Sequence, residues 1–304
     1  MNMPVTRRAR SMAELGELQA RASSPERRQA SIDSFHPRSG DVVISPYSKC
    51  GTTWLQQTFH TLRTRGDLDF DDISRVVPWI ETASLLGIDL DAPQKAQPRG
   101  FKSHLAYDAI PKGARYIVSL RDPHDAALSH LRFMEGWWLE PGAVTVTEFV
   151  AARMSLRDGE RDYWHHLISW WEQRENPNVL LLTYEQMSAN PEAHIRRIAA
   201  FCGIPLDDAL LELTLERSSL AFMRAHKQLF DDRMMREAAE QMIGLEAGGD
   251  SAKVRAGRVG SHEHEMPPEA IAMLDAVWAE TVAPRTGFAN YRQLDEALRV
   301  SVHQ

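Results

Sequence analysis

A short stretch of the sequence is suited to holding a phosphate group. Residues 45–54 read Ser-Pro-Tyr-Ser-Lys-Cys-Gly-Thr-Thr-Trp and follow the run Asp-Val-Val-Ile at 41–44. A tight turn between a buried strand and a helix directs backbone N–H groups and the positive end of the helix dipole at one point. Lys49 adds a mobile charge, and Thr52 and Thr53 add hydroxyl donors. The spacing is not that of a Walker A loop, so an ordinary turn with a surface lysine is the alternative interpretation.

Other groups with chemical potential also follow predicted strands. His104 lies two residues beyond the run at 99–102, and Arg121 follows the β-rich run at 114–120. Ser129 lies eight residues beyond Arg121, two turns into a predicted helix, so both could reach a second anion. A helix-capping arginine and a buried serine are the alternative. His104 could take a proton from an attacking alcohol, because imidazole titrates near neutral pH; a structural histidine is the alternative there.

The elements that must position these groups alternate between strand and helix. Strands are predicted at 41–45, 99–102, 114–120 and 178–183. Helices are predicted at 52–65, 122–130, 145–157, 163–174, 190–203, 206–217, 218–226 and 267–282, with a short one near 77–81 and a mobile loop at 227–260. This order predicts an α/β fold with a central parallel sheet flanked by helices. Lys49, His104 and Arg121 should then converge beyond the carboxyl ends of the strands.

Composition limits the classes of protein that the chain can represent. It has 304 residues and a net charge of −7, so nothing suggests nucleic-acid binding and any anion site must be local. Two cysteines cannot form a disulfide framework. No apolar run approaches the length of a membrane span, and the arginine-rich start lacks the apolar stretch of a secretory signal. We expect a cytoplasmic enzyme with a peripheral N-terminal arm or helix at 1–35 and one domain at 36–304.

Five segments, in order along the chain, resemble the motifs of the cytosolic-type sulfotransferases. They are the 5′-phosphosulfate loop at 46–54, the segment with the catalytic histidine at 99–105, the 3′-phosphate strand and helix at 116–129, the Tyr-Glu-Asp-Met segment at 179–187 and the Arg-Lys-Gly-x-x-Gly segment at 254–260. The similarity spans residues 41–280. The chain is therefore identified as a member of this family, and we expect a bacterial member with the P-loop-like sulfotransferase fold.

The resemblance implies transfer of a sulfuryl group from 3′-phosphoadenosine 5′-phosphosulfate to an acceptor hydroxyl or amine, which leaves adenosine 3′,5′-bisphosphate. It implies that His104 is the general base, that Lys49 and Lys102 stabilise charge on the transferring group, and that no metal is required. The residues implied to bind the donor are Lys49, Cys50, Gly51, Thr52, Thr53, Trp54, Arg121, Ser129, Tyr184, Ser218, Arg255, Ala256 and Gly257.

Among the positions that depart from the family pattern, three bear on donor binding. Cys50 replaces a serine in the loop, Ala256 replaces a lysine beside Arg255, and Leu220 stands where the family has a stacking aromatic residue. Because Cys50 lies beside a lysine and a helix N-terminus, we expect a lowered thiol pKa. The C-terminal dimerisation pattern of the animal enzymes is absent, so the sequence leaves the oligomeric state open.

The acceptor is predicted from the apolar content of three segments, 66–97, 134–145 and 227–250, which favours a phenol, a steroid or a lipid alcohol. Trp137 and Trp138 could line its pocket or belong to the core, whereas Trp170 and Trp171 are predicted to be core residues.

Two other functions are compatible with these residues. A P-loop kinase or NTPase would need Asp122 as a magnesium ligand, and a non-catalytic adenine-nucleotide-binding relative is the other alternative. The run His-Glu-His-Glu at 262–265 could suggest a metal site, but it lacks the H-E-x-x-H spacing, so a solvated loop is the better interpretation.

Overall fold

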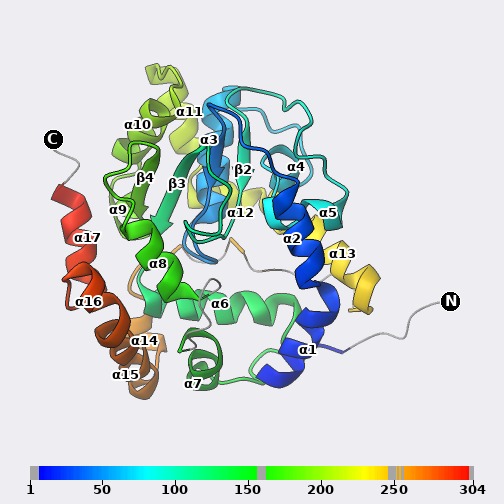
Figure 1. The fold of residues 1–304 in the computed structure, drawn as a ribbon, viewed down its shortest axis with the longest axis vertical. Helices are drawn as coiled ribbons and strands as arrows, with labels where there is room; N and C mark the ends of the chain where they lie inside the picture. Colours follow the sequence, from blue (N-terminus) through cyan, green and yellow to red (C-terminus); the bar gives the residue numbers. More distant parts are fainter. Residues whose placement is uncertain (1–6, 156–161, 246–250, 252, 255–256, 301–304) are drawn as a thin grey trace.

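A parallel four-stranded sheet forms the centre of the molecule (Figure 1). The computed structural model describes residues 7–155, 162–245, 251, 253–254 and 257–300. The strands are β1 (Val42–Ile44), β2 (Gly100–Lys102), β3 (Arg115–Leu120) and β4 (Val179–Thr183), in the order β2-β1-β3-β4. Val43 of β1 pairs with Phe101 on one side and Tyr116 on the other. The predicted α/β fold with a parallel sheet is confirmed, and all four predicted strands are present.

Helices surround this sheet. In chain order they are α1 (Met12–Ala22), α2 (Pro25–Asp33), α3 (Thr52–Thr64), α4 (Ile73–Val76), η1 (Ile80–Thr82), α5 (Ala83–Leu86), α6 (Pro123–Trp137), α7 (Val146–Phe149), η2 (Val150–Met154), α8 (Tyr163–Trp171), α9 (Tyr184–Ala189), α10 (Pro191–Cys202), α11 (Asp208–Arg217), α12 (Leu220–Ala225), η3 (Lys227–Leu229), α13 (Arg233–Ile243), α14 (His262–Glu265), α15 (Pro268–Val277), η4 (Trp278–Val282), α16 (Ala283–Thr286) and α17 (Tyr291–Val300).

Alternation along each strand divides the core into two apolar layers, because successive side chains of a strand point to opposite faces. Val42 and Ile44 pack with apolar residues of α3, α10 and α11. Val43 instead packs in a second layer, with Trp170 of α8 and Trp278 of η4. Both faces of the sheet are therefore covered, as the nearly unbroken apolar character of the strands requires.

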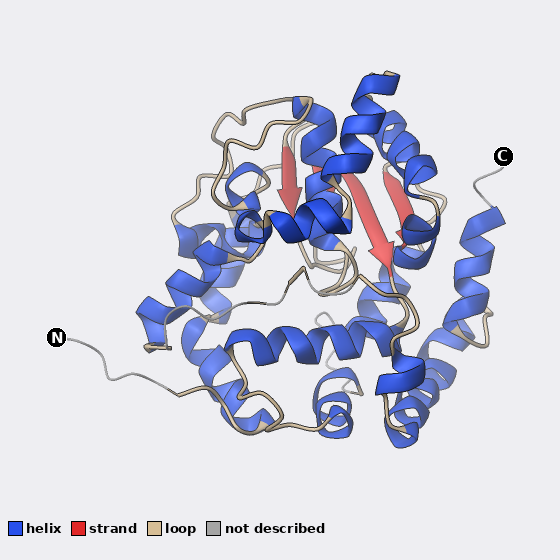
Figure 2. Cartoon of the chain, turned by 180° about the vertical axis from the view of Figure 1, so that it is seen from behind, coloured by secondary structure: helices blue, strands red, loops and turns tan. Residues whose placement is uncertain are grey.

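Helix α6 runs across the carboxyl ends of the strands, and both views show the strands pointing toward it (Figures 1 and 2). Asp122 caps this helix by accepting a hydrogen bond from the N–H of His124 at 2.8 Å, and Pro123 occupies its first turn. The helix extends to Trp137, seven residues beyond its predicted end. Apolar residues on the buried face of α6 pack in the same core layer as Leu15 and Leu18 of α1.

The prediction of a loop at 227–260 is wrong for residues 233–243. They form α13, which buries Ala239 and Ile243 in the core layer that α1 and α6 share. The charged residues in this segment suggested a loop, but apolar residues at helical spacing give the helix a face to bury. Helix α17 was not predicted either; it packs against β4 and buries Leu294 in the layer that contains Trp278. Among the described residues, no helix has both the length and the apolar character that a membrane span requires.

Replacing Gly100 by alanine should destabilise the fold, because a Cβ atom there would lie 2.1 Å from Cε1 of Phe59. Strand β2 and helix α3 would have to separate, which costs about 1–3 kcal/mol in an overpacked core. We expect a lower urea midpoint for Gly100→Ala. Gly16→Ala in α1 is the matched control: nothing lies within 4 Å of a Cβ there, so it should stabilise the protein by roughly 0.5–1 kcal/mol. A midpoint for Gly100→Ala at or above that of the wild type would contradict this packing.

Candidate active site

The turn between β1 and α3 has a backbone conformation that few residues tolerate. Lys49 has a φ of 68° and Gly51 a φ of 95°, both in the left-handed region. A side chain at position 51 would also approach Tyr184 to 3.1 Å and the hydroxyl of Ser119 to 3.3 Å, so glycine is required twice over. The hydroxyl of Ser119 donates to the carbonyl of Cys50, and Nη1 of Arg121 donates to the carbonyl of Lys49 at 2.9 Å. Ser119 of β3 and Arg121, which directly follows this strand, thus hold the turn.

The N-terminus of α3 is left without a side-chain cap by this turn. Its N-cap residue, Gly51, has no side chain to offer, and the buried hydroxyl of Thr52 has no hydrogen-bond partner within the described structure. Uncapped N–H groups at the positive end of a helix, beside an unpartnered hydroxyl, form a site for an anion. The phosphate-binding interpretation of 45–54 therefore has local geometry in its favour.

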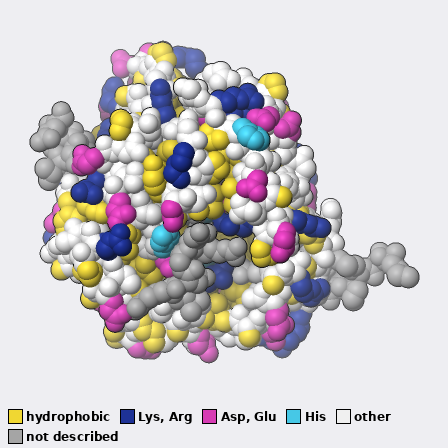
Figure 3. Space-filling model, in the orientation of Figure 1, with side chains coloured by type: hydrophobic (Ala, Val, Ile, Leu, Met, Phe, Trp, Pro, Cys, Tyr) yellow, Lys and Arg dark blue, Asp and Glu magenta, His cyan; other side chains and the backbone are white. Residues whose placement is uncertain are grey.

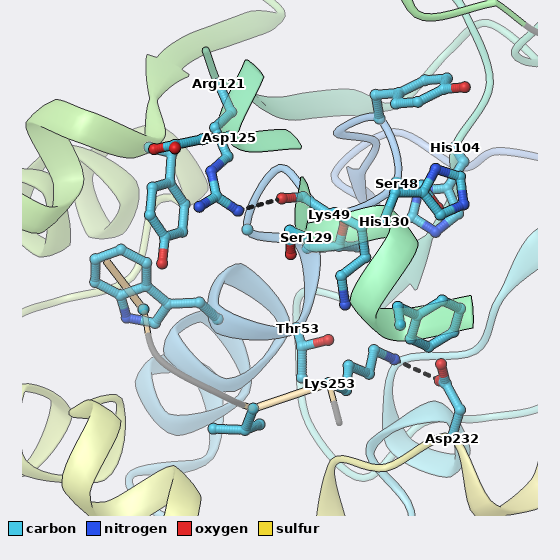
Figure 4. Close-up of a pocket in the computed structure, with 18 of the residues that line it drawn as sticks. Ser48, Lys49, Thr53, His104, Arg121, Asp125, Ser129, His130, Asp232 and Lys253 are labelled. Atoms are coloured by element: carbon cyan, nitrogen blue, oxygen red, sulfur yellow. Dashed lines mark hydrogen bonds and ion pairs between the residues drawn. The ribbon is translucent and has the colours of Figure 1, made fainter. Parts of the chain in front are cut away.

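One cavity of about 710 Å³ brings together most of the predicted site residues (Figure 4). Those that line it are Lys49, Gly51, Thr52, Thr53, Trp54, Lys102, His104, Arg121, Ser129, Tyr184, Ser218 and Gly257. The predicted convergence of Lys49, His104 and Arg121 is confirmed. The cavity is also lined by Leu220, which lies close to Gly257: a Cβ atom on residue 257 would lie 3.0 Å from Cδ2 of Leu220. Arg255 and Ala256 lie outside the described residues.

An aromatic pair and an arginine form one end of the cavity. The rings of Trp54 and Tyr184 meet edge to face with centroids 5.6 Å apart. The guanidinium of Arg121 lies over the ring of Tyr184, 4.3 Å from its centroid, and its Nη2 donates to the carbonyl of Arg258 at 3.2 Å. This end can take a flat ring together with an anion, and the side chain of Lys49 extends away from it (Figure 4).

His104 has the protonation state that a general base requires. Its Nδ1 lies 2.7 Å from the carbonyl oxygen of Pro46, which can only accept, so Nδ1 carries the proton and Nε2 is left with a lone pair. Burial, and then the nearby charge of Lys102, lower the pKa of His104 well below its ordinary value. The ring also packs edge-on against Trp79 at 5.1 Å. At neutral pH the imidazole is therefore uncharged and can accept a proton.

Burial makes the two site lysines less basic than lysine in water. Burial lowers the pKa of Lys49 to about 7 and that of Lys102 to about 8. Lys49 Nζ lies 4.5 Å from the centroid of Phe133, and Lys102 Nζ lies 3.7 Å from that of Trp79. An anion bound between the lysines would raise both pKa values, because it restores the stabilisation that ammonium groups lose on leaving water. This arrangement favours a ligand with negative charge.

Lys253 and Asp232 also line the cavity, and the sequence reasoning did not identify either. Lys253 Nζ lies 2.5 Å from Oδ1 of Asp232, and Lys102 Nζ lies 3.8 Å from the same oxygen (Figure 4). Burial raises the pKa of Asp232, but the charges of Lys102 and Lys253 outweigh it and hold the pKa well below the ordinary value. Asp232 is one of three non-glycine residues with positive φ in the described part of the chain, a conformation that recurs at functional sites.

Asp125 fastens the segment around residue 260 to α6. Its carboxylate accepts hydrogen bonds from the N–H of Gly260 at 2.7 Å and from the N–H and Nδ1 of His262, each at 3.0 Å. The solvated-loop interpretation of 262–265 is therefore wrong for His262, which begins α14 and is held by a buried carboxylate. With Asp122 and His124 it also forms a group whose potential metal-ligating atoms all lie within 4.8 Å of one another.

Known proteins resemble this chain in both sequence and fold. A family model described as the sulfotransferase domain matches residues 39–285. The chain belongs to the sulfotransferase family. It is 29% identical to sulfotransferase 1B1 of Canis lupus familiaris over 205 residues, 64% of this chain and 69% of that protein. It is 25% identical to luciferin sulfotransferase of Photinus pyralis over 281 residues, 80% and 72% of the two chains. These relatives come from animals and give no support to the expected bacterial origin.

Solved sulfotransferase structures share the fold. Mouse sulfotransferase SULT7A1, complexed with PAP, aligns with a TM-score of 0.63 at 21% identity, covering 85% of this chain and 90% of that one. A retinol dehydratase in complex with androsterone and the inactive cofactor PAP aligns with a TM-score of 0.69 at 17% identity, covering 93% and 97%. At these identities the likeness shows the sulfotransferase fold, as predicted.

Cys50 does not present its thiol to the cavity of this sulfotransferase. The side chain is 1% exposed and packs in the core, and the N–H donates to the carbonyl of Tyr47 at 3.1 Å. Burial raises the pKa of the Cys50 thiol to about 12, against the opposing charges of Arg121 and Lys49. The predicted lowering of this pKa is therefore wrong, because desolvation outweighs the neighbouring cations. Cys50 shapes the turn and brings no side-chain group to the cavity.

The tryptophans considered above differ in whether they also line the cavity. Trp170 and Trp171 are core residues, as predicted. Trp137 ends α6 and Trp138 follows it; each is 7% exposed, packs with apolar residues of α1 and lines the cavity. The two alternatives for this pair are thus both correct, because the core layer between α1 and α6 forms a wall of the cavity.

Neither cysteine of this sulfotransferase should react with a thiol reagent while the chain is folded. Burial raises the pKa of Cys50 and of Cys202 to about 12, so the thiolate fraction at pH 8 should be roughly a thousandfold below that of an unperturbed thiol. Disulfide-exchange titration at pH 8 should detect no rapid thiol in the folded protein and two in urea. Rapid labelling of the folded chain, mapped to Cys50 by mass spectrometry, would contradict the burial of this side chain.

Proposed function

We propose that this protein transfers the sulfuryl group of 3′-phosphoadenosine 5′-phosphosulfate to the hydroxyl, or an amine, of a small apolar or amphipathic acceptor. The observation that carries the proposal is the imidazole of His104, held through Nδ1 by the carbonyl of Pro46, in the cavity that also contains Lys49, Lys102 and the uncapped start of α3. A base and a charge-stabilising site for an anion are what in-line group transfer requires.

Each group has a role in the proposed transfer. The acceptor oxygen attacks sulfur as the bond from sulfur to the phosphate oxygen breaks, and Nε2 of His104 takes the acceptor proton. Lys49, Lys102 and the N–H groups of α3 stabilise the charge that develops on the sulfuryl group and on the leaving phosphate. The products are a sulfate ester and adenosine 3′,5′-bisphosphate.

The donor fits the two ends of the cavity. Trp54 and Tyr184 would contact adenine, while Arg121, Ser129 and Gly257 would hold the 3′-phosphate with Arg255. The solved relatives with PAP support this donor, and the relative with androsterone supports a hydrophobic alcohol as acceptor. Leu220 lines the cavity where the family has a stacking aromatic residue, so one face of adenine would meet an aliphatic side chain.

The alternatives have less in their favour. Asp122, which a kinase would need for magnesium, hydrogen-bonds the N–H and ring of His124 at 2.8 Å. A non-catalytic relative would not require His104 to be oriented through Nδ1 by the carbonyl of Pro46, with Nε2 able to accept a proton. Bacterial origin, a cytoplasmic location, independence from metal and the contribution of Ala256 to donor binding remain predictions.

Figure 3 shows acidic and basic side chains interspersed on one face of the molecule, in keeping with the net charge of −7. An anionic donor would therefore be attracted by the local cavity cations rather than by a general positive field, and binding should discriminate between nucleotides.

Adenosine 3′,5′-bisphosphate should bind at least tenfold more tightly than ADP or ATP, because Arg121 and Ser129 would recognise a 3′-phosphate. Removing the Arg121 charge by Arg121→Met should weaken bisphosphate binding about 10- to 100-fold, as expected for a charge-assisted hydrogen bond. Isothermal titration calorimetry measures both effects, with Arg196→Met on the exposed face of α10 as the control. Preference for ATP, with dependence on magnesium, would sink the sulfotransferase proposal.

His104→Ala should lower kcat by a factor of about 10² to 10⁴, the usual contribution of a general base, and leave bisphosphate binding within about threefold. His165→Ala is the matched control, because that imidazole pairs with Asp108 and does not line the cavity. Transfer assays with the labelled donor and a panel of phenols and steroids measure the rates. Unchanged turnover in His104→Ala would remove this residue from the mechanism.

A further inference from the structure

The cavity continues past the proposed transfer site into a region with apolar walls. The walls are formed by Phe133, Met134, Trp137, Trp138 and Met235, from α6, the residue after it and α13. Helices α1 and α7 lie farther from the sheet than α6 does, and residues of α1 and of η2, which follows α7, also line the cavity (Figure 1). The inference below rests on the proposed function, since this region is where an acceptor would extend from His104.

Arg153 of η2 lines this region, and its guanidinium has a neutral partner. Its Nη2 donates to Oε1 of Gln19 at 3.1 Å, and Nε2 of Gln19 in turn donates to the sulfur of Met134 at 3.5 Å. Within the described residues, Arg153 has no carboxylate partner. A guanidinium has five N–H donors, so most remain for a ligand. A half-buried cation beside apolar walls is costly without an anion, and Gln19 fixes its direction without neutralising it.

His130 adds a second unsatisfied group to the same cavity. Its side chain lies on α6, is 5% exposed and packs edge-on against Phe149 at 5.4 Å. Its Nδ1 is buried and has no hydrogen-bond partner in the described part of the chain. Burial, and then the charges of Arg153 and Lys49, lower the pKa of His130 well below its ordinary value. The ring is therefore neutral and can donate one hydrogen bond to an oxygen ligand.

The carboxylates that line the cavity are engaged elsewhere. Within the described residues they are Asp125 and Asp232. Asp125 accepts from Gly260 and His262, and Asp232 pairs with Lys102 and Lys253. An anion that entered with the acceptor would therefore meet Arg153 and Lys49, while both of these carboxylates are already hydrogen-bonded or paired with other groups.

We propose that the preferred acceptor is an alcohol or phenol with an apolar body and a carboxylate away from the hydroxyl that is sulfated. The apolar body would lie along α6, against Phe133 and Trp137, with the hydroxyl at His104. The carboxylate would accept charge-assisted hydrogen bonds from Arg153, and His130 is placed to contribute a further donor. Neutral phenols and steroids would then be poorer acceptors than hydroxy acids of similar size.

Matched pairs of acceptors test this proposal. Each pair consists of a hydroxyphenylalkanoic acid and its primary carboxamide, which differ in charge but hardly in shape, in a series of chain lengths. For the best length, kcat/KM should be at least tenfold higher for the acid, with the difference mainly in KM, because the carboxylate is bound equally before and during transfer. Arg153→Gln should bring the ratio of acid to amide close to one, and Arg153→Lys should retain part of it.

Arg21→Gln is the control, because it removes the same charge from an exposed position on α1 that does not line the cavity. It should keep the full ratio. The anion-site proposal is overturned if the wild-type ratio of acid to amide is near one at every chain length, or if Arg153→Gln leaves that ratio unchanged. Sulfation of the amides in that case would leave the proposed function standing.

Binding gives a readout that does not need transfer. Quenching of tryptophan fluorescence can report acceptor binding, because Trp137 and Trp138 line the region. With adenosine 3′,5′-bisphosphate bound, we expect the acid to bind at least tenfold more tightly than the amide. If neither compound is sulfated but the acid binds selectively, and Arg153→Gln abolishes that selectivity, the anion site stands and the proposed transfer fails. Equal binding of acid and amide would overturn the anion site.

Discussion

The left-handed backbone at Lys49 and Gly51 is the constraint on which the site depends. It reverses the chain directly after β1, so that α3 begins beside the carboxyl ends of the strands with its N–H groups uncapped. Ser119 and Arg121, from β3 and its end, hold this turn through the carbonyls of Cys50 and Lys49. The turn therefore depends on the pairing of β1 with β3, and the sheet and the anion site form one structure.

Burial tunes the groups around that turn in opposite directions. It lowers the pKa of Lys49, Lys102 and His104, and it raises the pKa of Cys50. In every case the charged form is the one disfavoured by loss of water. The result is a neutral base, lysines that gain from a bound anion and an inert thiol. Charge is thus concentrated where a polyanionic donor can stabilise it, although the protein as a whole is negative.

Much of the fold and of the candidate site could be predicted from the sequence, because both depend on local patterns. Apolar runs of strand length and the alternation with helices gave the parallel sheet, and residues placed after strands gave Lys49, His104 and Arg121. Helix α13 was missed because its charged residues suggested a loop. The core layer into which it packs is formed by α1 and α6, which are distant from it in sequence. Asp232, Lys253 and Arg153 belong to no local motif, so their meeting in one cavity could not be predicted.

The sequence by itself determined the family and the class of fold, and it predicted the groups that line the candidate site, since each is encoded in short segments whose spacing is fixed along the chain. Only the tertiary structure decided the state of Cys50, the dual place of Trp137 and Trp138, and the surroundings of Arg153 and His130. Burial and pairing decide these properties, and both are set by contacts between residues far apart in sequence. A lysine beside a cysteine predicts a reactive thiol until the core that surrounds the sulfur is known.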